Sequence, residues 1–227
     1  DQLIAVAKAT RKVDPNILIY TDPTTGSTVE LIESLVPYID IWCPSAELIE
    51  RSGDDLIPLF KKYGKEVWFY DAAGHSRTLS TLGIYRWRPW ESWSRGFTGC
   101  GHWVYSSHPH DLWLGPNPSA NYYPTVYDGE GVVTSKRWEA CREGAEDYEY
   151  LYLLREMIRS AKEKGVAKEK IDKAQAVLER ADTITKLLCD VGRRVSTDTD
   201  GVPLYNEATD ALNRYRKEVL NACLPLR

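Results

Sequence analysis

The chain has 227 residues, of which 43% are hydrophobic and 27% are charged. This share of apolar side chains can bury a substantial core, so the composition excludes a disordered or collagen-like chain. The formal net charge is −4 and the 29 Lys and Arg residues are spread along the sequence, which gives no electrostatic reason to expect a nucleic-acid partner. No apolar run approaches the roughly 18 residues that cross a bilayer, so we expect no membrane partner either.

The first half of the chain alternates between helix-type and strand-type patterns. Apolar residues at helical spacing between Leu3 and Val13 predict a helix that ends at Asp14-Pro15, because proline cannot extend it. A short apolar strand is expected next, over residues 17–20. The pattern then repeats, with helices expected over residues 28–36, 46–62 (with a break near Ser52-Gly53) and about 81–96, and strands over residues 39–43, 67–70 and 101–105.

Short apolar strands separated by helices predict an α/β fold with a parallel sheet and right-handed crossovers. A doubly wound sheet and a (β/α)8 TIM barrel both produce this pattern locally. Two features favour the barrel: bulky polar and aromatic residues stand at the predicted strand ends, and no glycine-rich phosphate-binding loop follows any strand.

The second half of the chain begins with a long segment over residues 106–134 that is rich in Pro, Gly, Trp and Tyr. We interpret it as a functional loop, because it leaves the end of the last predicted strand and its aromatic content argues against disorder. A helix starting near Arg137 follows, and two more amphipathic helices are expected over residues 168–190 and 205–223, separated by a polar turn. These last two helices predict a small helical appendage.

The helix after Arg137 carries the most informative run of the chain. Residues 135–151 read Ser-Lys-Arg-Trp-Glu-Ala-Cys-Arg-Glu-Gly-Ala-Glu-Asp-Tyr-Glu-Tyr-Leu. Apolar residues recur there at three- and four-residue steps, and Arg142 has Glu139 and Glu146 within pairing reach. The run resembles the Arg-Trp-Glu-Ala-x-Arg-Glu-Gly-x-Glu-Asp-Tyr-Glu-Tyr-Leu helix that closes the catalytic barrel of glycoside hydrolase family 123, whose members remove β-linked N-acetylgalactosamine from glycans.

The resemblance implies that residues 1–160 are the C-terminal half of a TIM barrel, about strands 5 to 8, and that residues 161–227 are a helical extension. It implies a retaining exo-glycosidase whose nucleophile is the 2-acetamido group of its glycan or amino-sugar substrate. No cofactor is expected, and the resemblance favours a periplasmic or secreted protein.

In that family an adjacent Asp-Glu pair at the end of the fourth strand supplies the general acid and orients the acetamido group. This chain contains no Asp-Glu dipeptide, so the resemblance implies that the pair lies upstream of Asp1 and that the N-terminal half of the same barrel is a required partner. Two other acidic pairs are interpreted as structural. Asp54-Asp55 is expected at a helix start, and Glu146-Asp147 is expected to pair with Arg142 or with barrel backbone.

Carbohydrate sites combine aromatic platforms with fixed polar groups, because a sugar ring has apolar faces rimmed by hydroxyls. By their positions at strand ends and in the long loop, the candidate substrate-binding residues are Trp42, Asp71, Trp103, Tyr105 and Trp113. For each aromatic residue among them, a barrel-filling role remains an alternative. Trp68, Trp87, Trp90 and Trp93 are weaker candidates, since a helix on the outside of the barrel accounts for most of them.

Tyr70 is the candidate catalytic residue. The resemblance implies that its hydroxyl contacts the forming oxazoline, through a match to the Trp68-Phe69-Tyr70 strand. We expect no metal, because His102, His108, His110 and Asp111 lack a second spaced pair and the five cysteines include no Cys-x-x-Cys motif. The alternative function is a non-catalytic carbohydrate-binding or structural protein derived from a barrel, which would keep the same aromatic residues without the acid.

Overall fold

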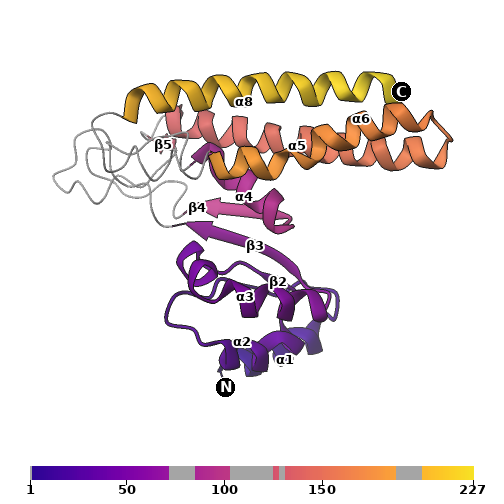
Figure 1. The fold of residues 1–227 in the computed structure, drawn as a ribbon. Coiled ribbons are helices and arrows are strands. Elements are labelled where there is room, and N and C mark those ends of the chain that lie inside the picture. Colours follow the sequence, from indigo (N-terminus) through magenta and orange to yellow (C-terminus); the bar gives the residue numbers. More distant parts are fainter. Residues whose placement is uncertain (1, 72–84, 103–124, 128–130, 188–200) are drawn as a thin grey trace. The chain divides into compact units, whose positions relative to one another are not determined.

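The computed structural model describes residues 2–71, 85–102, 125–127, 131–187 and 201–227 (Figure 1). The chain divides into two compact units. The sheet unit comprises Asp1–Ala72 with Gly96–Trp103, and the helical unit comprises Ala73–Arg95 with Val104–Arg227. The predicted strands lie in the sheet unit, whereas the helix expected over about residues 81–96 belongs to the helical unit.

Helices and strands alternate along the sheet unit. In chain order they are α1 (Gln2–Val13), β1 (Tyr20–Thr21), α2 (Val29–Leu35), the 3-10 helix η1 (Val36–Tyr38), β2 (Ile41–Trp42), α3 (Ala46–Lys62), β3 (Glu66–Asp71) and β4 (Gly99–His102). The four strands form one sheet in the order β1-β2-β3-β4, and each neighbouring pair is parallel. The expected α/β fold with a parallel sheet is confirmed at this level.

The predicted break in the helix over residues 46–62 is wrong. α3 runs unbroken from Ala46 to Lys62, and the Oγ atom of Ser45 caps it by accepting a hydrogen bond from the Leu48 amide at 3.3 Å. Gly53 lies buried in the middle of this helix, so the helix continues through it despite the low helix propensity of glycine. Asp54 and Asp55 are consequently exposed residues of a helix interior and do not stand at a helix start.

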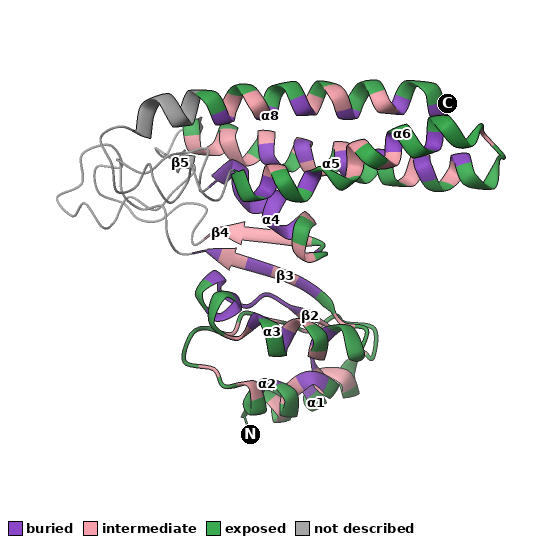
Figure 2. Ribbon diagram, in the orientation of Figure 1, coloured by how far each residue is buried: buried purple, intermediate pink, exposed green. Residues whose placement is uncertain are grey.

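The core of the sheet unit lies between the sheet and its helices. Alternate strand residues point to opposite faces, so Val67 and Phe69 of β3 are buried while Trp68 and Tyr70 are half-buried, an alternation that Figure 2 shows along the strand. The buried strand residues pack against apolar side chains of α2, η1 and α3, which are Ile32, Val36, Leu48, Ile49, Leu56 and Phe60. One face of the sheet is thus filled by helices.

The helical unit contains α4 (Trp87–Arg95), β5 (Thr125–Tyr127), β6 (Val132–Thr134), α5 (Lys136–Glu163), α6 (Lys168–Glu179), α8 (Gly201–Cys223) and the 3-10 helix η4 (Leu224–Leu226). The two strands pair as an antiparallel hairpin, within the segment that the sequence analysis interprets as a loop. The helix expected over residues 168–190 is interrupted, since α6 ends at Glu179 and helical residues resume at 181–187. No helix in the described ranges is both long and apolar enough to cross a membrane.

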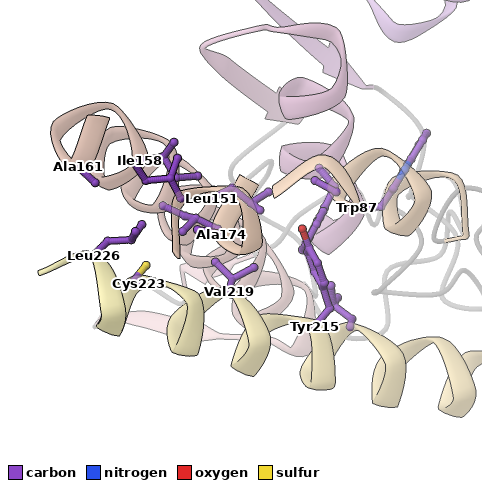
Figure 3. Packing of buried hydrophobic residues seen from close by; sticks show 14 of the residues in the cluster. Trp87, Leu151, Ile158, Ala161, Ala174, Tyr215, Val219, Cys223 and Leu226 are labelled. Atoms are coloured by element: carbon purple, nitrogen blue, oxygen red, sulfur yellow. The ribbon is translucent and has the colours of Figure 1, made fainter. Parts of the chain in front are cut away.

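One hydrophobic core holds the helical unit together (Figure 3). α5 contributes Leu151, Leu154 and Ile158, while Tyr215 and Val219 come from α8, and all five are at most 3% exposed. α5 also crosses the boundary expected near residue 160, and helices on both sides of that position share this core.

Candidate functional site

The face of the sheet opposite the helices carries aromatic side chains. We call it the open face, and its members are Tyr20 of β1 with Trp68 and Tyr70 of β3. The rings of Tyr20 and Trp68 are in contact, with centroids 5.9 Å apart and planes inclined by 50°. Tyr20 is 47% exposed, and Trp68 and Tyr70 are half-buried. Trp68 therefore lies on the face that could receive a ligand, whereas Trp87 and Trp90 belong to the core of the helical unit.

The indole of Trp68 is fixed in position by its neighbours. Its Nε1 atom donates a hydrogen bond to Oε1 of Glu66 at 2.9 Å, and the Thr98 hydroxyl donates to the same oxygen at 2.9 Å. Trp68 is paired with Gly99 across β3 and β4, and a glycine there leaves the ring room to lie against the neighbouring strand. Tyr20 and Trp68 thus form an aromatic platform, in which the Trp68 ring is held by Glu66 of β3 and lies against Gly99 of β4.

The carboxyl ends of the strands come together at one edge of the sheet, which we call the carboxyl edge. Backbone hydrogen bonds continue past the strand ends, from the Cys43 amide to the Thr21 carbonyl at 2.8 Å and from the Tyr70 amide to the Pro44 carbonyl at 3.1 Å. Asp22 and Cys43 lie one residue past the ends of β1 and β2, and Tyr70 lies near the end of β3, opposite Ser45. The three side chains stand on the open face and are close enough for their charges to interact. Glu47 joins them from the first turn of α3.

The polar groups of the carboxyl edge affect one another's ionisation. The Tyr20 hydroxyl donates a hydrogen bond to the Cys43 sulfur; burial, this hydrogen bond and the Asp22 charge together raise the pKa of Tyr20. Burial raises the pKa of Tyr70, and the negative charges of Asp22 and Glu47 raise it further. Both phenols stay protonated at neutral pH. The Tyr70 hydroxyl can donate a hydrogen bond to a ligand, whereas the Tyr20 hydroxyl donates its proton to Cys43.

The Cys43 thiol is similarly held neutral. It is 3% exposed, and burial raises its pKa, with a further contribution from the Asp22 carboxylate. A neutral, buried thiol is a poor nucleophile. Cys43 thus contributes packing and a hydrogen-bond acceptor for Tyr20 rather than covalent chemistry.

The structure brings only part of the predicted site together. Tyr70 lies on the open face at the carboxyl edge, as a ligand-contacting residue should. Asp71 follows it but is only 5% exposed. Trp103, Tyr105 and Trp113 lie outside the described residues.

Trp42 is not brought to this site. Its side chain is fully buried on the helix-packed face, where its ring lies 5.1 Å from that of Phe60 with the planes inclined by 31°. Side chains alternate between faces along a strand, so it is the next residue, Cys43, that reaches the site. Within the described part of the chain, the Trp42 Nε1 atom has no hydrogen-bond partner.

Sequence reasoning missed Tyr20, Asp22 and Glu47 as site residues. The first two have the two-residue spacing that places strand residues on one face, and Asp22 stands one residue beyond the end of β1. That periodicity was a usable signal for both residues. Glu47 carried no such signal, because it belongs to a helix whose first turn reaches the edge only in the folded chain.

The acidic pair Glu146-Asp147 lies in the helical unit and is structural there. Glu146 forms ion pairs with Arg142, as expected, and with Arg216 at 2.6 Å. Asp147 is fully buried, and its carboxylate accepts hydrogen bonds from Nε of Arg86 at 2.8 Å and from Nε1 of Trp90 at 3.2 Å. Burial raises the pKa of Asp147, and the Arg86 charge opposes that effect. The expected partner of Asp147, barrel backbone or Arg142, is replaced by Arg86.

Among the described residues, no group of three or more His, Cys, Asp or Glu side chains is arranged to hold a metal ion. His108, His110 and Asp111 lie outside those residues. The sequence matches no known protein-family model, and no curated protein matches it. Functional inference therefore rests on the geometry of the carboxyl edge and on the sequence of α5.

Proposed function

We propose that this chain is the sugar-binding part of a retaining exo-glycosidase, resembling glycoside hydrolase family 123, that hydrolyses β-linked N-acetylgalactosamine by substrate-assisted catalysis. The observation that carries the proposal is the position of Tyr70. Its neutral phenol stands on the open face at the carboxyl edge of a parallel sheet, next to the aromatic platform of Tyr20 and Trp68.

The strand order supports a barrel segment. Strands that pair in sequential order, β1-β2-β3-β4, agree with part of a (β/α)8 barrel, whereas a doubly wound sheet reverses its order at a switch point. In a barrel, the open face would be the interior and the carboxyl edge would be the mouth at which active sites are found. Tyr70 would then point toward a bound substrate.

The chemistry of the site fits an N-acetylated sugar. The apolar face of a sugar ring can lie against Trp68 and Tyr20, and the Tyr70 hydroxyl can donate a hydrogen bond to the acetamido group as its carbonyl oxygen attacks the anomeric carbon. A donor that holds this oxygen in line with the anomeric carbon positions it for attack, so its effect is mainly on the transition state.

The general acid would come from elsewhere in the protein. The chain has no Asp-Glu dipeptide, and the carboxylates of the described carboxyl edge belong to separate elements. We propose that the N-terminal half of the barrel supplies the pair, while this chain supplies recognition. A non-catalytic carbohydrate-binding protein would have the same platform and differ only in lacking that acid.

Calorimetric titration of the 227-residue chain tests the proposal. We expect saturable binding of N-acetylgalactosamine and weaker binding of galactose, which lacks the acetamido group. Tyr70→Phe should bind N-acetylgalactosamine within a few fold of the unaltered chain, since its hydroxyl acts mainly on the transition state. Equal binding of the two sugars by the unaltered chain would contradict the proposal. Hydrolysis of an aryl glycoside after the N-terminal half is added would separate the glycosidase from the non-catalytic binder.

A further inference from the structure

Asp22 occupies a position at the carboxyl edge that the proposed function does not use. It lies one residue beyond β1, and the backbone bonds from Cys43 to Thr21 and from Ser45 to Pro23 (2.9 Å) fix the chain on both sides of it. Its side chain is exposed. A carboxylate in a fixed stretch of backbone at a ligand-binding edge is preorganised to receive hydrogen bonds from a ligand.

The Asp22 charge acts on the same groups that line the proposed site. Its field raises the pKa values of Tyr20, Cys43 and Tyr70, so the carboxylate is close to all three side chains. These residues come from three different strands. Asp22 also stands two residues after Tyr20, so both side chains lie on the same face of the sheet, and the hydrogen bond from the Cys43 amide to the Thr21 carbonyl places Cys43 beside them.

Negative charge predominates at this edge. Glu47 also acts on Tyr70, whereas Asp71 is buried and lies on the helix-packed face of β3. The described segments 20–28, 41–47, 66–71 and 99–102, which include the strand ends, contain no Lys or Arg. Arg51 of α3 donates hydrogen bonds to the carbonyls of Thr25 and Ser27 in the loop after β1.

We propose that Asp22 is a sugar-binding residue that accepts hydrogen bonds from ring hydroxyls and makes the site reject anionic amino sugars. This inference rests on the proposed function, because it assumes that a sugar occupies the platform of Tyr20 and Trp68. A carboxylate has two acceptor oxygens and suits a pair of adjacent hydroxyls, and hydrogen bonds to a charged group are stronger than those between neutral groups. The same charge repels a sulfate on the ligand, with no described cation to offset it.

Three probes separate the hydrogen-bonding role of Asp22 from its rejection of anionic sugars. They are N-acetylgalactosamine, its 6-sulfate, and galactosamine with its ammonium group. For the complete 227-residue chain, calorimetric titration should show that the neutral and cationic sugars bind more tightly than the sulfated one. Asp22→Asn should weaken N-acetylgalactosamine binding by about tenfold or more, since it removes charged hydrogen bonds. Asp22→Asn should also reduce the difference in affinity between N-acetylgalactosamine and its 6-sulfate, most clearly at low salt.

Asp22→Glu keeps the charge but displaces the carboxylate by one methylene. It should lose affinity for N-acetylgalactosamine and still reject the sulfated sugar, which isolates the hydrogen bonds from the charge. Asp55→Asn is the matched control, because Asp55 is an exposed carboxylate of the same unit in the interior of α3. Asp55→Asn should change neither the affinity for N-acetylgalactosamine nor the affinity for its 6-sulfate. Circular dichroism should show the same helix content for all variants.

The results distinguish failure of the inference from failure of the proposed function. If the unaltered chain binds N-acetylgalactosamine and Asp22→Asn binds it equally well, with the same preference against sulfate, the role of Asp22 is wrong and the proposed function stands. If the unaltered chain binds none of the three sugars, both are overturned.

Discussion

Gly99 makes room for the indole ring of Trp68. A Cβ atom at position 99 would lie 2.7 Å from Cγ and Cδ1 of that ring, a separation that carbon atoms do not tolerate. The next glycine of β4 on the same face, Gly101, differs, because a Cβ atom there would stand 3.6 Å from Cβ of Tyr70, an ordinary contact. Two glycines on one strand thus have different roles, and the aromatic platform depends on the first.

We predict that Gly99→Ala displaces Trp68 and destabilises the sheet unit by about 1–3 kcal/mol, the usual cost of overpacking. The midpoint of urea unfolding should fall, and the near-ultraviolet circular dichroism of the folded chain should change. Gly101→Ala is the matched control and should leave both measurements almost unaltered. Equal effects of the two substitutions would show that the packing of Trp68 on β4 does not depend on Gly99.

The ion pair between Arg86 and Asp147 should be essential to the helical unit. Asp147→Asn removes the buried counter-charge of Arg86 and leaves only the partly exposed Glu143, 2.8 Å from its Nη1 atom, so we expect a loss of about 3 kcal/mol in unfolding free energy. Thermal denaturation of the variant and of the unaltered chain measures this loss of stability. Glu139→Gln removes only an exposed ion pair with Arg142 and should cost at most about 1 kcal/mol. A double variant with apolar residues at both buried positions should be more stable than Asp147→Asn, and the opposite order would contradict this account.

The raised pKa of Tyr20 predicts that the stability of the folded chain depends on pH in the alkaline range. Burial, with the hydrogen bond to Cys43, raises its pKa in the folded chain above the value of about 10 expected when unfolded. The folded state then holds the phenol proton more tightly than the unfolded state. The associated stabilisation is complete below about pH 10 and is lost as pH rises through the folded pKa.

We therefore expect Tyr20→Phe to make stability fall less steeply with pH above about 10 than it does in the unaltered chain. Urea midpoints measured at a series of pH values between about 8 and 11 give the two slopes. Absorbance at about 295 nm provides an independent readout, since Tyr20 should not ionise with tyrosines of ordinary pKa. Parallel slopes would indicate that the Tyr20 hydroxyl is not buried against Cys43.

Activity should require both halves of the proposed barrel. We expect no hydrolysis of an aryl β-N-acetylgalactosaminide by the 227-residue chain alone, because general acid catalysis needs a positioned carboxyl group. Hydrolysis should begin when the N-terminal half is supplied. Turnover by the purified chain alone, abolished by a substitution within it, would place the catalytic center in this chain instead.

In the active protein, Tyr70→Phe should lower kcat by about tenfold or more and leave KM within a few fold, since the hydroxyl acts mainly on the transition state. Tyr63→Phe removes the same hydroxyl from an exposed tyrosine that follows α3, away from the carboxyl edge, and serves as the control. An unchanged kcat in Tyr70→Phe would show that Tyr70 is not a catalytic residue.

The local sequence pattern was sufficient to predict much of the secondary structure of the sheet unit. The apolar run before Asp14-Pro15 predicted α1, and the strand after residue 66 was found within one residue of its observed ends. These features depend on side-chain periodicity and on the restrictions of proline, both of which act over a few neighbouring residues. The break expected near Gly53 failed, because glycine can end a helix or allow close packing, and only its burial distinguishes the two.

By itself the sequence determined most elements of the sheet unit, the parallel sheet and the position of Tyr70 at a strand end, because each follows from spacing along the chain. Tertiary structure alone decided which face each side chain occupies, and thus why Cys43 reaches the carboxyl edge while Trp42 packs against Phe60. It also decided the partner of Asp147, since Arg86 is 61 residues away in the chain and 2.8 Å away in space. Such relationships depend on the pairing of distant segments, and no local pattern encodes that pairing.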